Sequence, residues 1–180
     1  MRTSFYPAPL RDLFIRLAQA GLVQAKWTDA IHEEWMRNVL KDRPDLSPER
    51  LARTKALMDR AVRDCLVIGH ETLIDSLRLP DADDCHVLAA AIHGKASVII
   101  TYNLKDFPAD ILSRYDIKAL HPDDFLTDLF DEVTVPVIDT VKRQRERASV
   151  TLPKQQRNCW THSRTRGSRS SSAGFVPSLT

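Results

Sequence analysis

The spacing of apolar residues predicts helices over the first third of the chain. Leucine and phenylalanine recur every three or four residues in a first helix that Gly21 ends. Thr28 is a good N-cap for a second helix, because its hydroxyl can accept a hydrogen bond from the first turn. Ser47 and Pro48 begin a third helix, which the pattern extends to about Asp64.

Short apolar segments alternate with helical stretches further along the chain. The predicted strands are 66–68, 97–101 and 117–120, and the predicted helices are 71–77, 83–93 and 122–130. Segment 97–101 (SVIIT) is the best strand, because it is β-branched and continuously apolar, as buried parallel strands are. Strands separated by helices predict an α/β fold with a mostly parallel sheet and helices on both faces.

Composition indicates an ordinary folded protein. The 180 residues are 43% hydrophobic and 28% charged, which argues against a disordered or fibrous chain. The longest apolar run, 87–92, is far too short to span a membrane, and the N-terminus does not resemble a signal peptide. The three cysteines are widely separated and form no CxxC motif. We therefore expect a cytoplasmic protein with no membrane association.

The charge distribution divides the chain. Residues 154–180 hold five basic residues and no acidic one, so the other 153 residues carry 21 basic against 24 acidic residues, a net charge of −3. We expect a folded domain over 1–133, a helical extension over 134–153, and a disordered basic Ser/Arg-rich tail over 154–180. A flexible extension, an RNA-binding arm and a shifted reading frame are alternative interpretations of this tail.

Several common chemistries are excluded by missing motifs. The five glycines form neither a GxGxxG fingerprint nor a phosphate-binding P-loop, and no GxSxG nucleophile elbow occurs. The segment beginning at His32 starts like the zinc-protease motif HExxH, but Met36 stands where the second histidine is required. Nucleotide-binding cradles, serine hydrolases of this type and zinc proteases are therefore unsupported.

Two carboxylates lie on the inward side of predicted helices. With 100° per residue, Glu34 borders the apolar stripe of the second helix, whereas Glu33 points toward solvent. Asp84 begins the apolar stripe that continues through 87–92, whereas Asp83 suits an exposed cap position. Burying a charge without a partner is costly, so these two acids favour a functional interpretation.

Further polar residues follow the best strand. Asn103 and Asp106 lie beyond its carboxyl end, where ligands bind in open parallel sheets. Each also has a structural interpretation, since Asn103 suits a turn and Asp106 suits the cap of a short helix at Phe107. If these acids converge with Glu34 and Asp84, an oxygen-only site for Mg²⁺ or Mn²⁺ results, and it would support phosphodiester hydrolysis.

These residues resemble a known family. LPDADDCHVLAAAI at 79–92, SVIITYNLKDFP at 97–108 and TDAIHEEWMR at 28–37 are similar to PIN-domain proteins, the group that includes VapC-type toxin ribonucleases. The resemblance covers roughly residues 6–130. It implies a PIN-like three-layer α/β fold and an endoribonuclease that uses Mg²⁺ or Mn²⁺. It also implies an RNA substrate, an antitoxin protein partner and a homodimer.

The resemblance also assigns roles to residues. The family's catalytic and metal-binding acids fall on Glu34, Asp84 and Asp106, with Asp81 as a further metal ligand and Asn103 orienting a ligand. Independently of the resemblance, Lys105 and Arg37 are candidates for contacts with RNA phosphates, although charged residues are often only solvated.

The N-terminus departs from the family pattern. PIN domains begin with a strand inside the sheet that ends in an aspartate, and no acidic residue precedes Asp12 here. We therefore expect a truncated first strand, arising from a misplaced start or from a degraded copy. Two functions stay open, the metal-dependent ribonuclease and a non-catalytic PIN-like protein that binds RNA or an antitoxin-like partner. Another carboxylate-metal α/β protein, such as a receiver domain, is a more distant alternative.

Overall fold

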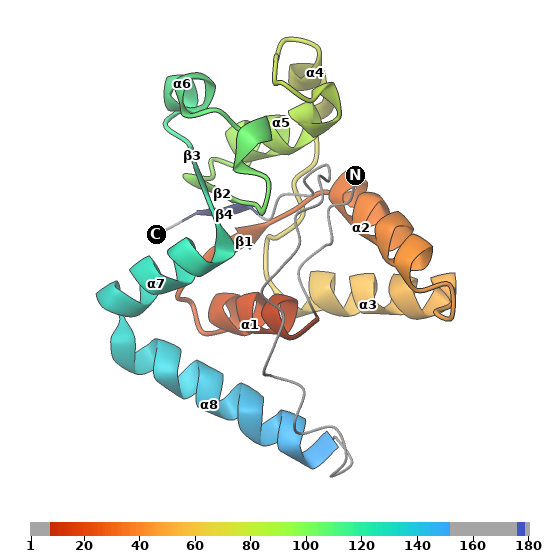
Figure 1. Cartoon of the computed structure of the whole chain (residues 1–180), viewed down its shortest axis with the longest axis vertical. Coiled ribbons are helices and arrows are strands. Elements are labelled where there is room, and N and C mark those ends of the chain that lie inside the picture. The colour runs from red at the N-terminus through yellow and green to blue at the C-terminus, as the bar shows by residue number, and fades with distance from the viewer. Residues whose placement is uncertain (1–7, 152–175, 179–180) are drawn as a thin grey trace.

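The structure is a computed structural model that describes residues 8–151 and 176–178. Helices and strands alternate along most of this range (Figure 1). The elements in chain order are α1 (Ala8–Gln19), β1 (Gln24–Lys26), α2 (Asp29–Asp42), α3 (Pro48–Ala61), α4 (Glu71–Ile74), α5 (Cys85–His93), β2 (Val98–Ile100), α6 (Ala109–Leu112), β3 (Lys118–Leu120), α7 (Pro122–Glu132), α8 (Thr134–Thr151) and β4 (Val176–Ser178).

The predicted helix caps form. The Thr28 hydroxyl accepts a hydrogen bond of 3.1 Å from the Ile31 backbone at the start of α2. Ser47 caps α3 in the same way, with Pro48 as the first helical residue. At the end of α5, the Gly94 N–H donates to the Ala90 carbonyl at 2.8 Å. Local sequence therefore determines where these three helices begin or end.

The sheet is built from short strands. Strands β2 and β3 are parallel, with Val98 opposite Lys118 and Ile100 opposite Leu120. Strand β1 pairs with β4 in the antiparallel direction, and Trp27, just after β1, makes one parallel bridge to Leu66. Strand β4 also lies beside β2, although the two are not hydrogen-bonded.

Strand β4 contains a proline. Pro177 lies opposite Ala25 in the middle of the strand, and proline has no backbone N–H to donate. The described strands form two hydrogen-bonded pairs, β1 with β4 and β2 with β3, and β4 lies beside β2.

Helices cover both sides of these strands. In Figure 1, α4, α5 and α6 lie above the strands, and α1 and α3 lie below them. One continuous apolar core joins the layers, with Phe14 and Trp35 from the N-terminal helices and Leu88 and Ile99 from α5 and β2, all fully buried. The α/β fold class and the parallel pairing of β2 with β3 agree with the prediction.

Several predicted boundaries were wrong. Segment 66–68 forms a single bridge rather than a strand, and Ile68 is 72% exposed. The third helix ends at Ala61 instead of near Asp64, which adopts a left-handed conformation with φ of 51°. Residue Phe107 starts no helix, because α6 begins only at Ala109. Strand β1 was not predicted at all.

The C-terminal part of the described structure contains a long helix and a short strand. Helix α8 accounts for most of the predicted extension 134–153, and it packs against α1 and α7 with Val137 in the core. Within the predicted disordered tail, Val176–Ser178 instead forms β4, while the rest of that tail and the N-terminal residues of the expected truncated strand lie outside the described residues. Throughout the described ranges, no helix combines the length and apolar character that crossing a bilayer requires.

Candidate metal centre

The candidate site lies at the carboxyl edge of the parallel strands. Strand β2 is followed by Thr101, Tyr102 and Asn103, and β3 by His121. Because the two strands are parallel and in register, these residues lie at the same edge of the sheet. This edge is where ligands bind in open α/β sheets.

A tight turn before α5 presents two aspartates. Asp81 accepts a hydrogen bond of 3.0 Å from the Asp83 backbone, and it caps the 3₁₀ turn Ala82–Asp84. That turn leaves Asp84 only 1% exposed at the start of α5, whereas Asp83 is exposed. The inward direction of Asp84 and the outward direction of Asp83 confirm the helical-wheel prediction for their burial.

The loop after β2 presents the third aspartate. The Thr101 hydroxyl accepts a hydrogen bond of 3.0 Å from the Asn103 backbone, which shapes the start of the loop. The Asn103 side-chain amide donates to one carboxylate oxygen of Asp106. Asn103 thus orients Asp106, which is half-buried at the end of the 3₁₀ turn Leu104–Asp106.

These three aspartates converge. Asp81, Asp84 and Asp106 each offer a carboxylate oxygen, and the three oxygens lie within 4.8 Å of one another. Two carboxylates at that separation repel by roughly 3 kcal/mol at an effective dielectric of about 20. Within the described residues, no lysine or arginine forms an ion pair with Asp81 or Asp106. The cluster could therefore hold a cation.

The donor set suits a small, hard cation. Mg²⁺ binds oxygen at about 2.0–2.1 Å, so ligands on opposite sides of it lie roughly 4.2 Å apart. Neighbouring ligands of an octahedral ion lie closer, roughly 3.0 Å apart, so the carboxylate oxygens, which lie within 4.8 Å of one another, would move inward to bind it. Carboxylate ligands without cysteine or histidine favour Mg²⁺ or Mn²⁺ over zinc. The residues present therefore fit such an ion.

Glu34 is not part of the cluster of three aspartates. It is 8% exposed on α2, and its Oε2 atom lies 3.7 Å from Nε2 of His86. His86 follows Asp84 by two residues, so α2 and the start of α5 approach each other at this contact. Burial lowers the pKa of His86, and the nearby His70 lowers it further. The cluster of converging oxygens comprises the three aspartates and does not include Glu34.

Comparison with known proteins identifies the family. The family model described as a PIN domain matches residues 6–105, more than half of the chain. The chain belongs to the PIN-domain family. That match includes Asp81 and Asp84 and ends one residue before Asp106. The resemblance inferred from the sequence motifs is confirmed.

A curated relative shares part of the sequence. This PIN-domain chain is 60% identical over 58 residues to "Putative ribonuclease VapC50" of Mycobacterium tuberculosis (strain ATCC 25618 / H37Rv). The match covers 31% of the chain and 34% of that relative, so the chain spans about a third of the length of the relative. No solved structure matches the chain.

The other predicted residues of the PIN domain take different positions. Arg37 on α2 is exposed, and so is Lys105, which directly precedes Asp106. Among the described residues, neither of the two forms an ion pair. Lys105 adjoins the acidic cluster through Asp106, whereas Arg37 lies on the exposed side of α2.

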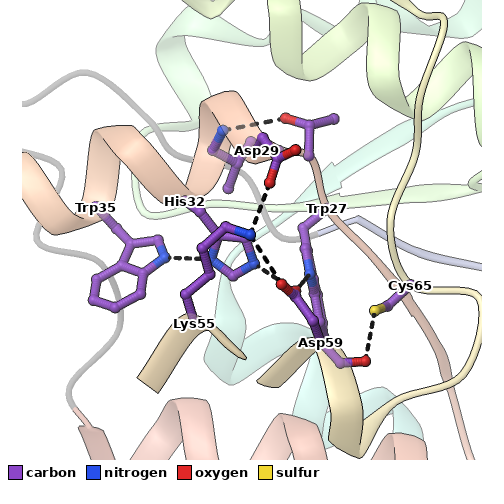
Figure 2. A network of polar contacts seen from close by, with 9 residues as sticks. Trp27, Asp29, His32, Trp35, Lys55, Asp59 and Cys65 are labelled. Carbon is purple, nitrogen blue, oxygen red and sulfur yellow. Dashed lines mark hydrogen bonds and ion pairs between the residues drawn. The ribbon is translucent and has the colours of Figure 1, made fainter. Parts of the chain in front are cut away.

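A buried polar network holds α2, the helix that carries Glu34 (Figure 2). Trp35 Nε1 donates to His32 Nδ1 at 2.7 Å, so the imidazole proton must lie on Nε2. His32 Nε2 then donates to Asp59 on α3 at 2.9 Å. Trp27 Nε1 donates to the same Asp59 oxygen at 2.8 Å. The network thus links α2, α3 and the end of β1.

The charges around this network are balanced. Burial lowers the pKa of His32, although Asp59 acts in the opposite direction, and the ring is therefore neutral at pH 7. Burial raises the pKa of Asp59, but hydrogen bonds from Trp27, Lys55 and His32 outweigh it and hold the value below the ordinary range. Lys55 also pairs with Asp29 at 2.8 Å. The apparent start of an HExxH motif is therefore a structural histidine on α2.

Sequence reasoning missed His86 and the aromatic pair beyond the strands. The sequence patterns assign no role to His86, although its position two residues after the inward-facing Asp84 is a usable signal. Tyr102 and His121 become neighbours only because β2 and β3 are parallel and in register. No local pattern indicates that contact.

Proposed function

We propose that this PIN domain is a metal-dependent endoribonuclease that hydrolyses phosphodiester bonds in RNA. The observation that carries the proposal is the convergence of Asp81, Asp84 and Asp106 at the carboxyl edge of the sheet. The name of the curated relative, a ribonuclease, supports RNA as the substrate class. We include an antitoxin protein partner, a homodimer and a cytoplasmic location in the proposal, as the family resemblance implies.

Each residue has a distinct role in this proposal. Asp81, Asp84 and Asp106 hold Mg²⁺ or Mn²⁺, and Asn103 keeps the Asp106 carboxylate turned toward the ion. When bound, the ion neutralises charge on the phosphate and lowers the pKa of water. Glu34, which lies 3.7 Å from His86 near the start of α5, is the candidate fourth acid. Lys105 and Arg37 attract RNA phosphates, which the net charge of −3 on residues 1–153 would otherwise repel.

The chain offers a matched pair of variants for the test. Asp84→Asn removes one charge from the cluster, whereas Asp83→Asn makes the same change on the exposed neighbouring residue. We expect Asp84→Asn to abolish cleavage of a labelled RNA in Mn²⁺ and to weaken Mn²⁺ binding measured by calorimetry. Asp83→Asn should leave both unchanged. Full cleavage by the wild type in EDTA would refute the metal mechanism.

One observation favours a second function, the non-catalytic interaction protein. The converging cluster contains three acids, and Glu34 faces His86 at 3.7 Å instead of joining it. A chain of this kind would bind RNA or an antitoxin-like protein without cleaving RNA. Titration with Mn²⁺ separates the two functions, because the absence of Mn²⁺ binding together with intact partner binding would exclude the enzyme.

A further inference from the structure

An aromatic pair lies beyond the carboxyl ends of β2 and β3. Tyr102 follows β2 by one residue and is 45% exposed. His121 directly follows β3 and is half-buried. Their ring centroids are 5.0 Å apart, and the ring planes meet at 79°. This edge-to-face geometry is a favourable aromatic contact that fixes the direction of the Tyr102 ring.

His121 is itself held in place. Its Nδ1 atom accepts a hydrogen bond of 3.2 Å from the Asp123 backbone, which caps helix α7. The helix terminus therefore anchors the imidazole, and the imidazole supports the tyrosine. Partial burial raises the pKa of Tyr102, and the Asp123 carboxylate raises it further, so the phenol is neutral at physiological pH. The pair presents a preorganised aromatic surface.

This aromatic surface adjoins the acidic cluster. Tyr102 immediately precedes Asn103, and the Cα atoms of consecutive residues lie about 3.8 Å apart. The Asn103 side chain donates a hydrogen bond to Asp106. Leu104, on the same loop, is 42% exposed, and Lys105 is also exposed. An exposed aromatic ring therefore lies on the residue next to the one that orients Asp106.

We propose that Tyr102, supported by His121, is a stacking platform for an RNA base next to the scissile phosphate. This inference rests on the proposed ribonuclease function and names the nucleotide contact of that site. The acidic net charge of residues 1–153 supplies little general attraction for RNA. Base stacking on an aromatic ring contributes about 1–3 kcal/mol per base without requiring charge, which offsets that deficit.

The test combines protein variants with RNA that lacks single bases. Tyr102→Ala removes the ring, Tyr102→Phe retains it, and Leu104→Ala is the control on the same loop. In the inactive Asp84→Asn background with Mn²⁺, we measure the Kd of a fluorescent single-stranded RNA by anisotropy. We expect Tyr102→Ala to weaken binding about tenfold, whereas Tyr102→Phe and Leu104→Ala bind as the parent does.

Abasic substitutions identify the contact. With Tyr102 present, removing one particular base should weaken binding about tenfold, and in Tyr102→Ala the same removal should have no effect. Equal losses in both proteins at every position would refute stacking while leaving the ribonuclease proposal intact. Loss of antitoxin binding with unchanged RNA binding in Tyr102→Ala would instead assign the surface to a protein partner and overturn the inference. If the wild type neither binds nor cleaves RNA, the proposed function itself fails.

Discussion

Removing the Asp59 carboxylate should destabilise the whole N-terminal half of the fold. Asp59 accepts hydrogen bonds from Trp27, His32 and Lys55, three residues from three different segments (Figure 2). The substitution Asp59→Ala deletes both carboxylate oxygens and therefore all three hydrogen bonds at once. It leaves the α3 backbone in place, including the Asp59 carbonyl that accepts from the Cys65 thiol.

The magnitude follows from the burial of the donors. Trp27 and His32 are each 1% exposed, so their N–H groups cannot turn to bulk water when the carboxylate is removed. Each buried donor left without an acceptor costs about 1–3 kcal/mol. Lys55 is 27% exposed and keeps its ion pair with Asp29, so losing its contact with Asp59 costs little stability. Some water will enter the vacated space and satisfy part of the need for acceptors. We therefore expect Asp59→Ala to lower the free energy of unfolding by about 2–4 kcal/mol.

The measurement is urea unfolding followed by circular dichroism at 222 nm, because the indole next to residue 59 would disturb a fluorescence signal. Asp45→Ala is the matched control, since Asp45 forms an ion pair with Arg43 that lies in solvent. We expect no measurable loss from that control. If Asp59→Ala loses no more stability than Asp45→Ala, the network does not support the fold as described.

The pH dependence gives an independent check. The pKa of Asp59 in the folded protein lies below its ordinary value of 3.8, so folding favours the ionised carboxylate. Its stabilisation is therefore fully present above pH 3.8 and is lost as the pH falls through the lower value of the folded state. The stability difference between wild type and Asp59→Ala should shrink on acidification below about pH 4. A difference that grows on acidification would contradict the direction of the pKa shift.

Two further predictions concern close packing and thiol chemistry. Gly94→Ala should destabilise the protein more than Gly21→Ala. The Cβ added at Gly94 would lie 2.9 Å from the Ala90 carbonyl oxygen, whereas at Gly21 only the positive φ of 73° opposes a side chain. The melting temperatures of the two variants compare these costs. Burial raises the pKa of the Cys65 thiol to about 11, so iodoacetamide at pH 8 should alkylate Cys65 only after unfolding, as read by peptide mass mapping. Rapid labelling in the folded state would contradict that protection.

Helical periodicity was sufficient to predict which acids are buried. Adjacent residues on a helix differ by 100°, so the apolar stripes alone distinguish Glu34 from Glu33 and Asp84 from Asp83, as their burial confirms. Caps such as Thr28 are equally local, because the side chain bonds within the first turn. The catalytic and metal-binding roles of these acids remain predictions.

Features that depend on distant pairing could not be read from local sequence. Strand β1 has the sequence QAK, which lacks any β-branched or aromatic residue, and it is extended because β4 pairs with it from about 150 residues away. Conversely, segment 66–68 looks like a strand, but the chain leaves the sheet after one bridge and exposes Ile68. The separation of Glu34 from the aspartates likewise depends on how α2 packs near α5.

The division of the strands into two pairs bears on the fourth acid. Among the described strands, no backbone ladder joins the β1 pair to the β2 pair, although β4 lies beside β2. Asp106 follows β2, whereas Glu34 follows β1. A contribution of Glu34 to the metal centre would therefore depend on how α2 packs against the start of α5, where Glu34 meets His86.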